Sequence, residues 1–220
     1  MALHHYYMKT MKTMRLWMMA TILFCGVGCV SSNSGSSSDA KDDQDSVDLV
    51  EEMGNYVFMP AVDQYLVDSI GAFYAPGELC IPCATIVACD QYSCDQSTPD
   101  SVLVLGDFWV FNYNVVGDTL KTVSGGSHPG AMNLKKTNTG YVVTSFEQVE
   151  DGHGNEASAR RIFGDMYEAF HGINSDQETR EEARSLAIAR YVKIHNLPVK
   201  YYQDNGWPAR EIPAKKMIRE

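Results

Sequence analysis

Four cysteines lie close together in the sequence, and no other residue type here offers as wide a range of chemistry. Cysteine thiolates bind zinc, and thiols that meet an oxidising compartment form disulfides. Four cysteines allow three pairings, of which we favour Cys89 with Cys94 because that bridge closes a short polar loop. Buried thiols and a four-cysteine zinc site are the alternatives. We expect structural cysteines, with no bound metal or cofactor, at Cys80, Cys83, Cys89 and Cys94.

The sequence Cys80-Ile81-Pro82-Cys83 resembles the CxxC motif of thioredoxin-like oxidoreductases, including its proline. The resemblance implies thiol redox catalysis by Cys80 and Cys83. That chemistry places the motif at a helix N-terminus, where the helix dipole stabilises the thiolate. The residues that follow, Thr85-Ile86-Val87, are β-branched and predict a strand instead. Redox catalysis is therefore an alternative and not the favoured interpretation.

An acid and a histidine indicate a second kind of chemistry. Asp107 lies close to Trp109 in an aromatic-rich stretch, and a buried carboxylate there can act as a general acid or base. His128 lies in the glycine-rich run from Ser124 to Gly130, which lacks the lysine and the strand-to-helix setting of a phosphate loop. Acid–base catalysis by Asp107 and His128 is thus one hypothesis. A bulge at Asp107 and a turn at His128 are the simpler interpretations.

The region from Val102 to Val149 predicts three or four antiparallel strands in sequence order. Aromatic and β-branched residues alternate there between turn signals. We expect turns at Gly117-Asp118, at Ser124 to Gly130 and at Asn138-Thr139-Gly140. Turns this close together favour a meander, because parallel strands need long connections.

One face of the predicted strand that contains Asp107 carries most of its aromatic area. Trp109, Phe111 and Tyr113 alternate onto that face, whereas Phe108 and Val110 alternate onto the other. Aromatic side chains bury large areas. We therefore expect the Trp109 face to be the one that packs on the core, over a helix that begins near Pro60.

Helices are expected before and after this sheet. Pro60 suits the first turn of a helix, and apolar residues follow it at helical spacing until Pro76. Residues 156–171 and 175–195 predict two later helices, and Ser175 with Glu178 fits a capping box for the second. We also expect short strands at residues 85–88 and 199–203, and Trp207 packed on the body of the domain.

The predicted fold class is α+β, with an N-terminal helix packed on a four- or five-stranded antiparallel meander and two C-terminal helices. Between Pro60 and Val149 this order resembles the cystatin or NTF2-like superfold, in which a curved sheet wraps a helix. The resemblance implies a concave sheet face that can take a ligand. That superfold contains enzymes, ligand binders and interaction modules, so it does not select a function.

The N-terminus carries the features of an export signal. Basic residues precede an apolar run from Leu16 to Val27, and this run is short for a membrane span. Gly26-Val27-Gly28-Cys29 resembles the lipobox of bacterial lipoproteins, with glycine at the position where leucine is usual. The resemblance implies a palmitate-bearing lipid on Cys29 after cleavage. The alternatives are ordinary cleavage and a free secreted protein, and Met8, Met11 and Met14 offer other starting points.

The composition of the rest of the chain indicates a tether, a folded domain and a tail. Residues 29–46 are rich in serine and aspartate and predict a disordered tether, which serves as a solvated spacer or, in some Gram-negative lipoproteins, resembles a surface-export signal. We expect residues 1–28 to form the signal peptide, residues 47–210 a single domain and residues 211–220 a tail. The net charge of −10 among 220 residues disfavours nucleic acid as a partner.

These features together predict a lipoprotein of the cell envelope, anchored to the outer membrane and facing either the periplasm or the surface. Its partners are then the membrane, through the N-terminal lipid, and a small-molecule, glycan or protein ligand. A binding module is favoured over an enzyme, because aromatic residues are abundant and no catalytic motif is specific. The candidate ligand-binding residues are Asp107, Trp109, Phe111, Tyr113, His128 and Tyr141.

Overall fold

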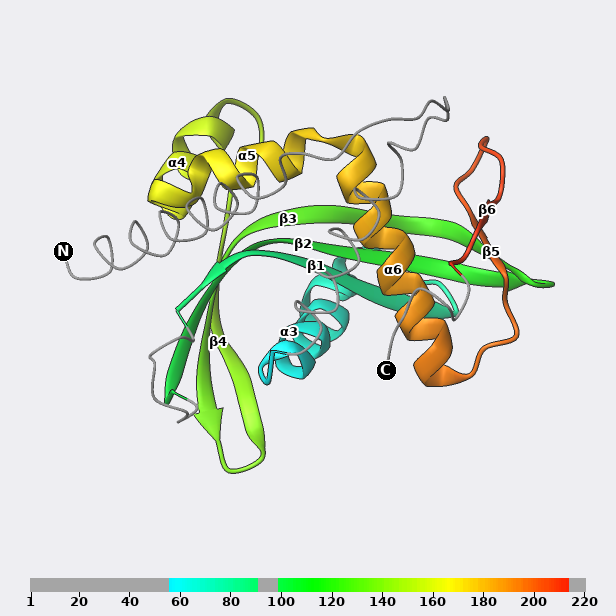
Figure 1. Cartoon of the computed structure of the whole chain (residues 1–220), viewed down its shortest axis with the longest axis horizontal. Helices are drawn as coiled ribbons and strands as arrows, with labels where there is room; N and C mark the ends of the chain where they lie inside the picture. The colour runs from blue at the N-terminus through cyan, green and yellow to red at the C-terminus, as the bar shows by residue number, and fades with distance from the viewer. Residues whose placement is uncertain (1–55, 91–98, 214–220) are drawn as a thin grey trace, which may run out of the picture. The chain divides into compact units, whose positions relative to one another are not determined.

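The structure is a computed structural model, and it describes residues 56–90 and 99–213 (Figure 1). The predicted signal peptide, the lipidation at Cys29, the acidic tether and Cys94 lie outside the described residues. So do residues 47–55 of the predicted domain and residues 214–220 of the tail. The described part contains both helices and a curled sheet, which confirms the mixed helix-and-sheet class.

Four long strands follow one another as an antiparallel meander: β1 (Leu79–Cys89), β2 (Ser101–Val116), β3 (Thr119–Thr137) and β4 (Gly140–Gln148). The first residues of β3, at the end remote from β4, pair with β5 (Tyr201–Gln203), and this pairing is parallel. A last short strand, β6 (Arg210–Glu211), pairs antiparallel with β5. The register shifts once in each pair of neighbouring long strands, and such bulges increase the local bend of a sheet.

The turn expected from Ser124 to Gly130 is wrong, because β3 runs straight through this glycine-rich segment. A Cβ atom on Gly125 would collide with the carbonyl oxygen of Val110, and one on Gly130 would collide with that of Glu147. Glycine inside a strand is typical of places where two backbones approach closely. The glycines therefore mark close packing of β3 against its neighbours, and His128 lies within a strand and not in a turn.

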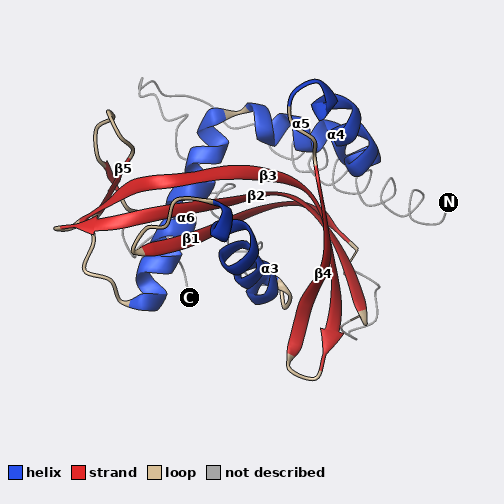
Figure 2. Cartoon of the chain, turned by 180° about the vertical axis from the view of Figure 1, so that it is seen from behind, coloured by secondary structure: helices blue, strands red, loops and turns tan. Residues whose placement is uncertain are grey.

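Both faces of the sheet are covered. Helix α3 (Met59–Tyr65), which continues through π-helical Leu66–Ile70 and 3-10 helical Gly71–Phe73, packs on the face that carries Phe108 and Val110. Helix α6 (Gln177–His195) packs on the opposite face, against Phe111 and Tyr113. The two helices lie on opposite sides of the sheet when it is viewed from the front and from behind (Figures 1 and 2).

The expectation that the Trp109 face packs on the Pro60 helix is therefore wrong. The helix that contains Pro60 buries Phe108 and Val110, and it lies in the angle formed where the strands bend (Figure 1). The centre of β2 is apolar on both faces, as is typical of strands covered on both sides. A comparison of the apolar area of the two faces therefore could not show which helix covers which face.

Three helices follow the sheet, where two were expected. They are α4 (Asn155–Phe163), α5 (Tyr167–Ser175) and α6, with 3-10 turns at Gly152–Gly154 and Gly164–Met166. Gly164 interrupts the predicted helix of residues 156–171 because its φ of 51° lies in the left-handed region, which favours glycine. Phe163 and Phe170 then stack on each other with ring centroids 4.0 Å apart, and this contact holds α4 and α5 together.

Helix α6 begins one residue later than the sequence predicted. Asp176, and not Ser175, caps it by accepting hydrogen bonds from the Glu178 amide at 3.0 Å and the Thr179 hydroxyl at 2.7 Å.

Beyond the helix, Trp207 is 71% exposed, so the expectation that it packs on the body of the domain is wrong. Within the part of the chain that the structure describes, no helix has the length and apolar character needed to cross a membrane.

A buried arginine joins α6 to the sheet. Arg184 is 7% exposed, and its Nε donates to the Tyr113 hydroxyl of β2 at 3.0 Å. Its two terminal nitrogens donate to the two carboxylate oxygens of Asp204, each at 2.8 Å, and one of them also donates to the Thr122 hydroxyl of β3 at 3.0 Å. The guanidinium further lies 4.4 Å from the ring centroid of Phe111. One side chain thus connects α6, β2, β3 and the turn after β5.

Replacing this arginine is expected to destabilise the domain strongly. Arg184→Ala removes a buried, fully hydrogen-bonded cation, and breaking such a pair costs about 3 kcal/mol or more. The matched control is Arg190→Ala on the same helix, whose side chain is exposed and whose loss is expected to cost no more than about 0.5 kcal/mol. Urea unfolding at pH 7 measures both, and equal losses for the two variants would contradict this role of Arg184.

The same pair predicts a pH dependence. Hydrogen bonds from Arg184 lower the pKa of Asp204 from its ordinary 3.8 to about 2. Above about pH 4 the Asp204 carboxylate is charged in both the folded and the unfolded chain, so the pair contributes fully to the free energy of unfolding. As the pH falls toward 2, the unfolded chain takes up the proton first, and the contribution of the pair to stability is lost. The stability difference between wild type and Arg184→Ala should therefore be constant near neutral pH and shrink in acid.

Candidate functional site

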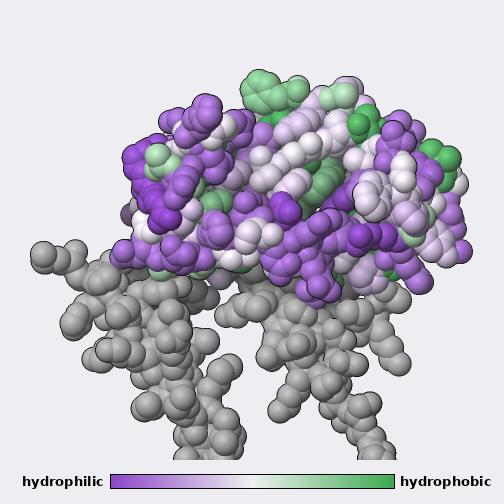
Figure 3. Space-filling view, turned by 90° about the horizontal axis from the view of Figure 1, so that it is seen from above, coloured by the Kyte–Doolittle hydropathy of each residue, from purple (hydrophilic) through white to green (hydrophobic). Residues whose placement is uncertain are grey.

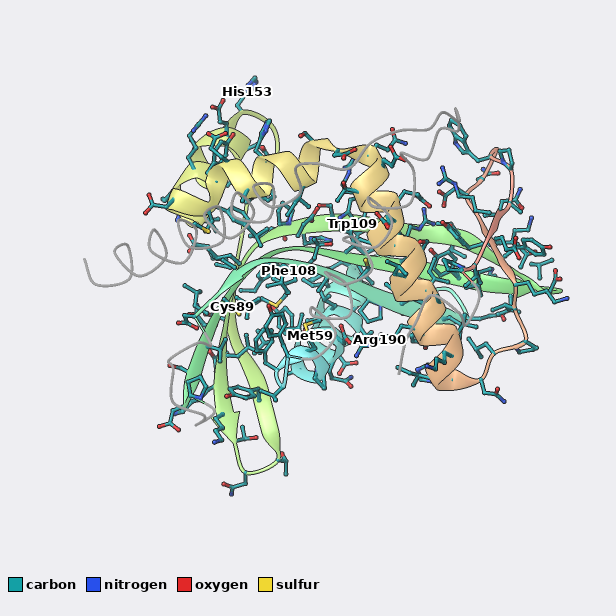
Figure 4. The ribbon with its side chains drawn as sticks, in the orientation of Figure 1. Met59, Cys89, Phe108, Trp109, His153 and Arg190 are labelled. Carbon is teal, nitrogen blue, oxygen red and sulfur yellow. The ribbon has the colours of Figure 1, made fainter. Side chains whose placement is uncertain are left out.

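A hollow of about 180 Å³ lies on the α6 face of the sheet. Its sheet side comes from β1 and β2, and its helix side comes from the first turns of α6. Figure 4 shows Trp109 beside the start of α6, whereas Phe108 lies on the side of Met59 and α3. The lining residues are Cys83, Thr85, Trp109, Phe111, Gln177, Arg180, Glu181 and Arg184.

Two stacked aromatic rings form one wall of this hollow. Trp109 and Phe111 are two residues apart on β2, so they lie on the same face of the strand. Their rings are nearly parallel, with an interplanar angle of 9° and centroids 5.4 Å apart. A guanidinium lies over each ring: that of Arg180 is 5.9 Å from the Trp109 ring centroid, and that of Arg184 is close to Phe111. The wall is therefore both apolar and electrostatically suited to cations.

The two arginines differ in how their charge is balanced. Arg184 makes the bidentate pair with Asp204, and Glu181 lies 3.6 Å from it as well. Arg180 Nε is covered by protein atoms, and among the described residues it finds no hydrogen-bond acceptor. A buried donor without a partner costs about 1–3 kcal/mol. Among the described residues that line the hollow, Arg180 is thus the one with a buried donor, Nε, left without an acceptor.

Asp107 lies behind the aromatic wall and orients it. The carboxylate is 1% exposed and accepts three hydrogen bonds: from the Trp109 indole nitrogen at 2.9 Å, from the Ser127 hydroxyl at 2.5 Å and from the Asn174 amide at 3.0 Å. These donors come from β2, β3 and α5. Asp107 therefore holds the indole in place and ties α5 to the sheet, and it does not line the hollow itself.

The structure separates the six candidate ligand-binding residues into two groups. Asp107, Trp109, Phe111 and Tyr113 share the α6 face, where Tyr113 is fully buried and its pKa is raised to about 12 by burial. His128 and Tyr141 lie on the opposite, α3 face, because His128 pairs with Phe108 across the two strands and Tyr141 packs on the α3 core. The two groups cannot contribute to one site.

This separation counts against the hypothesis of an Asp107–His128 acid–base pair. Asp107 is opposite Pro129 in the neighbouring strand, so it points away from the face on which His128 lies. The His128 ring nitrogens instead make hydrogen bonds with Tyr74 at 2.8 Å and Gln148 at 3.0 Å. Tyr141 donates its hydroxyl to the carbonyl of Pro99 at 2.7 Å.

The cysteines of the CxxC motif lie in the first half of β1 and not at a helix start. Cys80 and Cys83 are three residues apart in a strand, so they point to opposite faces: Cys80 packs toward α3, and Cys83 lines the hollow. Burial raises the pKa of Cys83 to about 12, and the nearby carboxylate of Asp107 adds to the effect. Burial also raises the pKa of Cys80. Thiols in this state are poor nucleophiles, which counts against the redox hypothesis.

The other predictions about cysteine are tested only in part. The described thiols of Cys80 and Cys83 are not joined to each other. The favoured Cys89–Cys94 pairing involves a residue outside the described ones. Among residues 56–90 and 99–213, no three histidine, cysteine or acidic side chains lie close enough to hold a metal ion.

The polar half of the hollow, which comes from α6, was not predicted from the sequence. Arg184 lies one turn before Ile188 and in line with it, so it belongs to the buried stripe of the helix. An arginine within an apolar stripe was the signal in the sequence that could have indicated this role of α6. Ile194, near the end of α6, is 65% exposed and lies outside that stripe.

Comparison of the chain with protein-family models, with curated proteins and with solved structures finds no match in any of the three. The site must therefore be interpreted from its own geometry.

Removing the Asp107 carboxylate is expected to destabilise the domain by about 3 kcal/mol, because Asp107→Ala leaves three buried donors without an acceptor. It should also release the indole of Trp109, which red-shifts its fluorescence. Trp207→Phe serves as the background, so that Trp109 dominates the emission of the domain. Asp118→Ala is the matched control, since Asp118 is exposed. Unchanged stability and an unchanged spectrum in Asp107→Ala would contradict the role assigned to this carboxylate.

Proposed function

We propose that this chain is a lipoprotein of the cell envelope whose folded domain binds a small molecule in the hollow beneath α6. The observation that carries the binding proposal is Arg180, a cation with an unused buried donor at the edge of an aromatic wall. A pocket that combines apolar walls with a few unsatisfied polar groups is the usual form of a ligand site.

The location of the hollow changes the earlier hypothesis about the concave face. That side of the sheet is filled by α3 and its core, whereas the hollow lies on the other face. A helix held in the bend of an antiparallel meander agrees with the cystatin or NTF2-like arrangement, and we propose that this chain shares it. The parallel strand β5 and the three later helices are additions to that arrangement.

A small ligand fits the surface better than a large apolar partner does. Figure 3 shows one side of the described domain, where most of the surface is hydrophilic and apolar residues form small separate groups. Broad docking surfaces usually present one contiguous apolar patch. Binding is also favoured over catalysis, because the two acid–base candidates lie on opposite faces and the described thiols have raised pKa values.

The envelope part of the proposal rests on the residues around Cys29. Cys29→Ser should abolish incorporation of labelled palmitate and move the protein from the membrane fraction to the soluble fraction, because stable anchoring requires two or more acyl chains. Cys80→Ser is the matched control and should leave both readouts unchanged. A wild-type protein that carries no palmitate and is soluble would refute the lipid anchor.

The binding part predicts ligand-dependent stabilisation that requires the aromatic wall. A library of small fragments should contain compounds that raise the Tm of the wild-type protein, since a ligand at 100 times its Kd adds about 2.7 kcal/mol to stability. Trp109→Ala should abolish these shifts. Tyr141→Phe, on the opposite face, should retain them. Shifts that persist in Trp109→Ala would place binding elsewhere, and no shift with any fragment would count against the proposal.

A further inference from the structure

We infer that the hollow selects a small planar carboxylate, of the class in which one aromatic ring carries one carboxyl group. The inference rests on the proposed binding function and specifies the ligand class for the same site. It follows from the charge left unbalanced in the hollow, from the shape of the wall and from the available volume.

The charge balance leaves one cation for a ligand. Arg184 is neutralised by Asp204, with Glu181 nearby. Glu181 in turn accepts a hydrogen bond from the Tyr202 hydroxyl at 2.8 Å and lies 3.5 Å from Arg210. Neither residue therefore has a charge free for a ligand.

Arg180 differs because no described carboxylate pairs with it in the hollow. Asp176, one turn earlier, uses its oxygens to cap the helix through Glu178 and Thr179. A carboxylate on Arg180 would make charge-assisted hydrogen bonds, which are about twice as strong as neutral ones. It would also give the unpartnered guanidinium the acceptor that the described residues do not provide.

The wall selects a flat, apolar body for this ligand. The rings of Trp109 and Phe111 stack on each other and carry guanidiniums over them, so a ligand ring would pack against their edges, in the edge-to-face arrangement that aromatic pairs favour. The Arg180 guanidinium lies 5.9 Å from the Trp109 ring centroid, so a carboxyl group on a ligand ring beside Trp109 can reach it. Thr85 and Gln177 add polar atoms at the lining, so a ring with a hydroxyl substituent also suits the hollow.

The volume sets the size of the ligand. An apolar protein cavity of about 150 Å³ holds one benzene molecule. The hollow, at about 180 Å³, therefore suits one ring and a carboxyl group. A phosphate ester is disfavoured, because a dianion needs more than one cation, and within residues 56–90 and 99–213 only Arg180 lines the hollow without an ion-pair partner.

The test measures the affinity of benzoate and of its neutral isostere benzamide by titration calorimetry with the full mature protein. We expect benzoate to bind about tenfold more tightly than benzamide, because only benzoate makes a charge-assisted pair with Arg180. Arg180→Gln should remove this preference. Arg190→Gln, an exposed position on the same helix, should keep the preference.

The outcomes separate this inference from the proposed function. If both compounds bind equally and Trp109→Ala abolishes both, the hollow binds small molecules but the carboxylate inference is wrong. If the preference for benzoate persists in Arg180→Gln, the inference is also wrong. If neither compound binds and the fragment library gives no Tm shift, the inference and the proposed function both fail.

Discussion

The arrangement of this domain depends on one buried charge. Moving an arginine out of water is expensive, and the cost is recovered only when every donor has a well-placed acceptor. Arg184 meets that condition through Tyr113, Thr122 and both oxygens of Asp204. Because these partners come from two strands and a distant turn, the helix cannot slide or rotate on the sheet without losing several of them. Directional contacts therefore set the position of α6 more strictly than apolar packing would.

This position of α6 accounts for the hollow. The middle of the helix is held against Tyr113 and Leu120, where the core is tightly covered. Its first turns lie over Trp109 and Phe111. The hydrogen bond from the Trp109 indole to Asp107 fixes that ring on the sheet, so it does not move to fill the remaining space. The hollow is thus formed by two rigid surfaces that meet at a fixed distance. Arg180 lies at the edge of that space, and the same geometry leaves its Nε without a hydrogen-bond acceptor among the described residues.

The sequence predicted those features that depend on local patterns. Alternation and Pro60 indicated the antiparallel strands and the approximate places of the helices, and Trp109 and Phe111 share a face as the alternation indicated. Features that depend on long-range contacts were missed. Glycines in β3 looked like a turn because the backbones that approach them come from other strands. The role of Arg184 and the covering of the second face of β2 likewise depend on α6, which is distant in the sequence. Tyr113 and Arg184, which are hydrogen-bonded, are separated by 71 residues.

The most direct test of this account is the coupling free energy between Arg184 and Asp204 in a double-mutant cycle. The cycle combines Arg184→Met and Asp204→Asn and compares the unfolding free energies of the wild type, both single variants and the double variant. The account predicts a coupling of at least about 1.5 kcal/mol at pH 7, within the range for residues in direct contact. A coupling indistinguishable from zero would show that the pair does not hold α6 in place, and the explanation of the hollow would then be wrong.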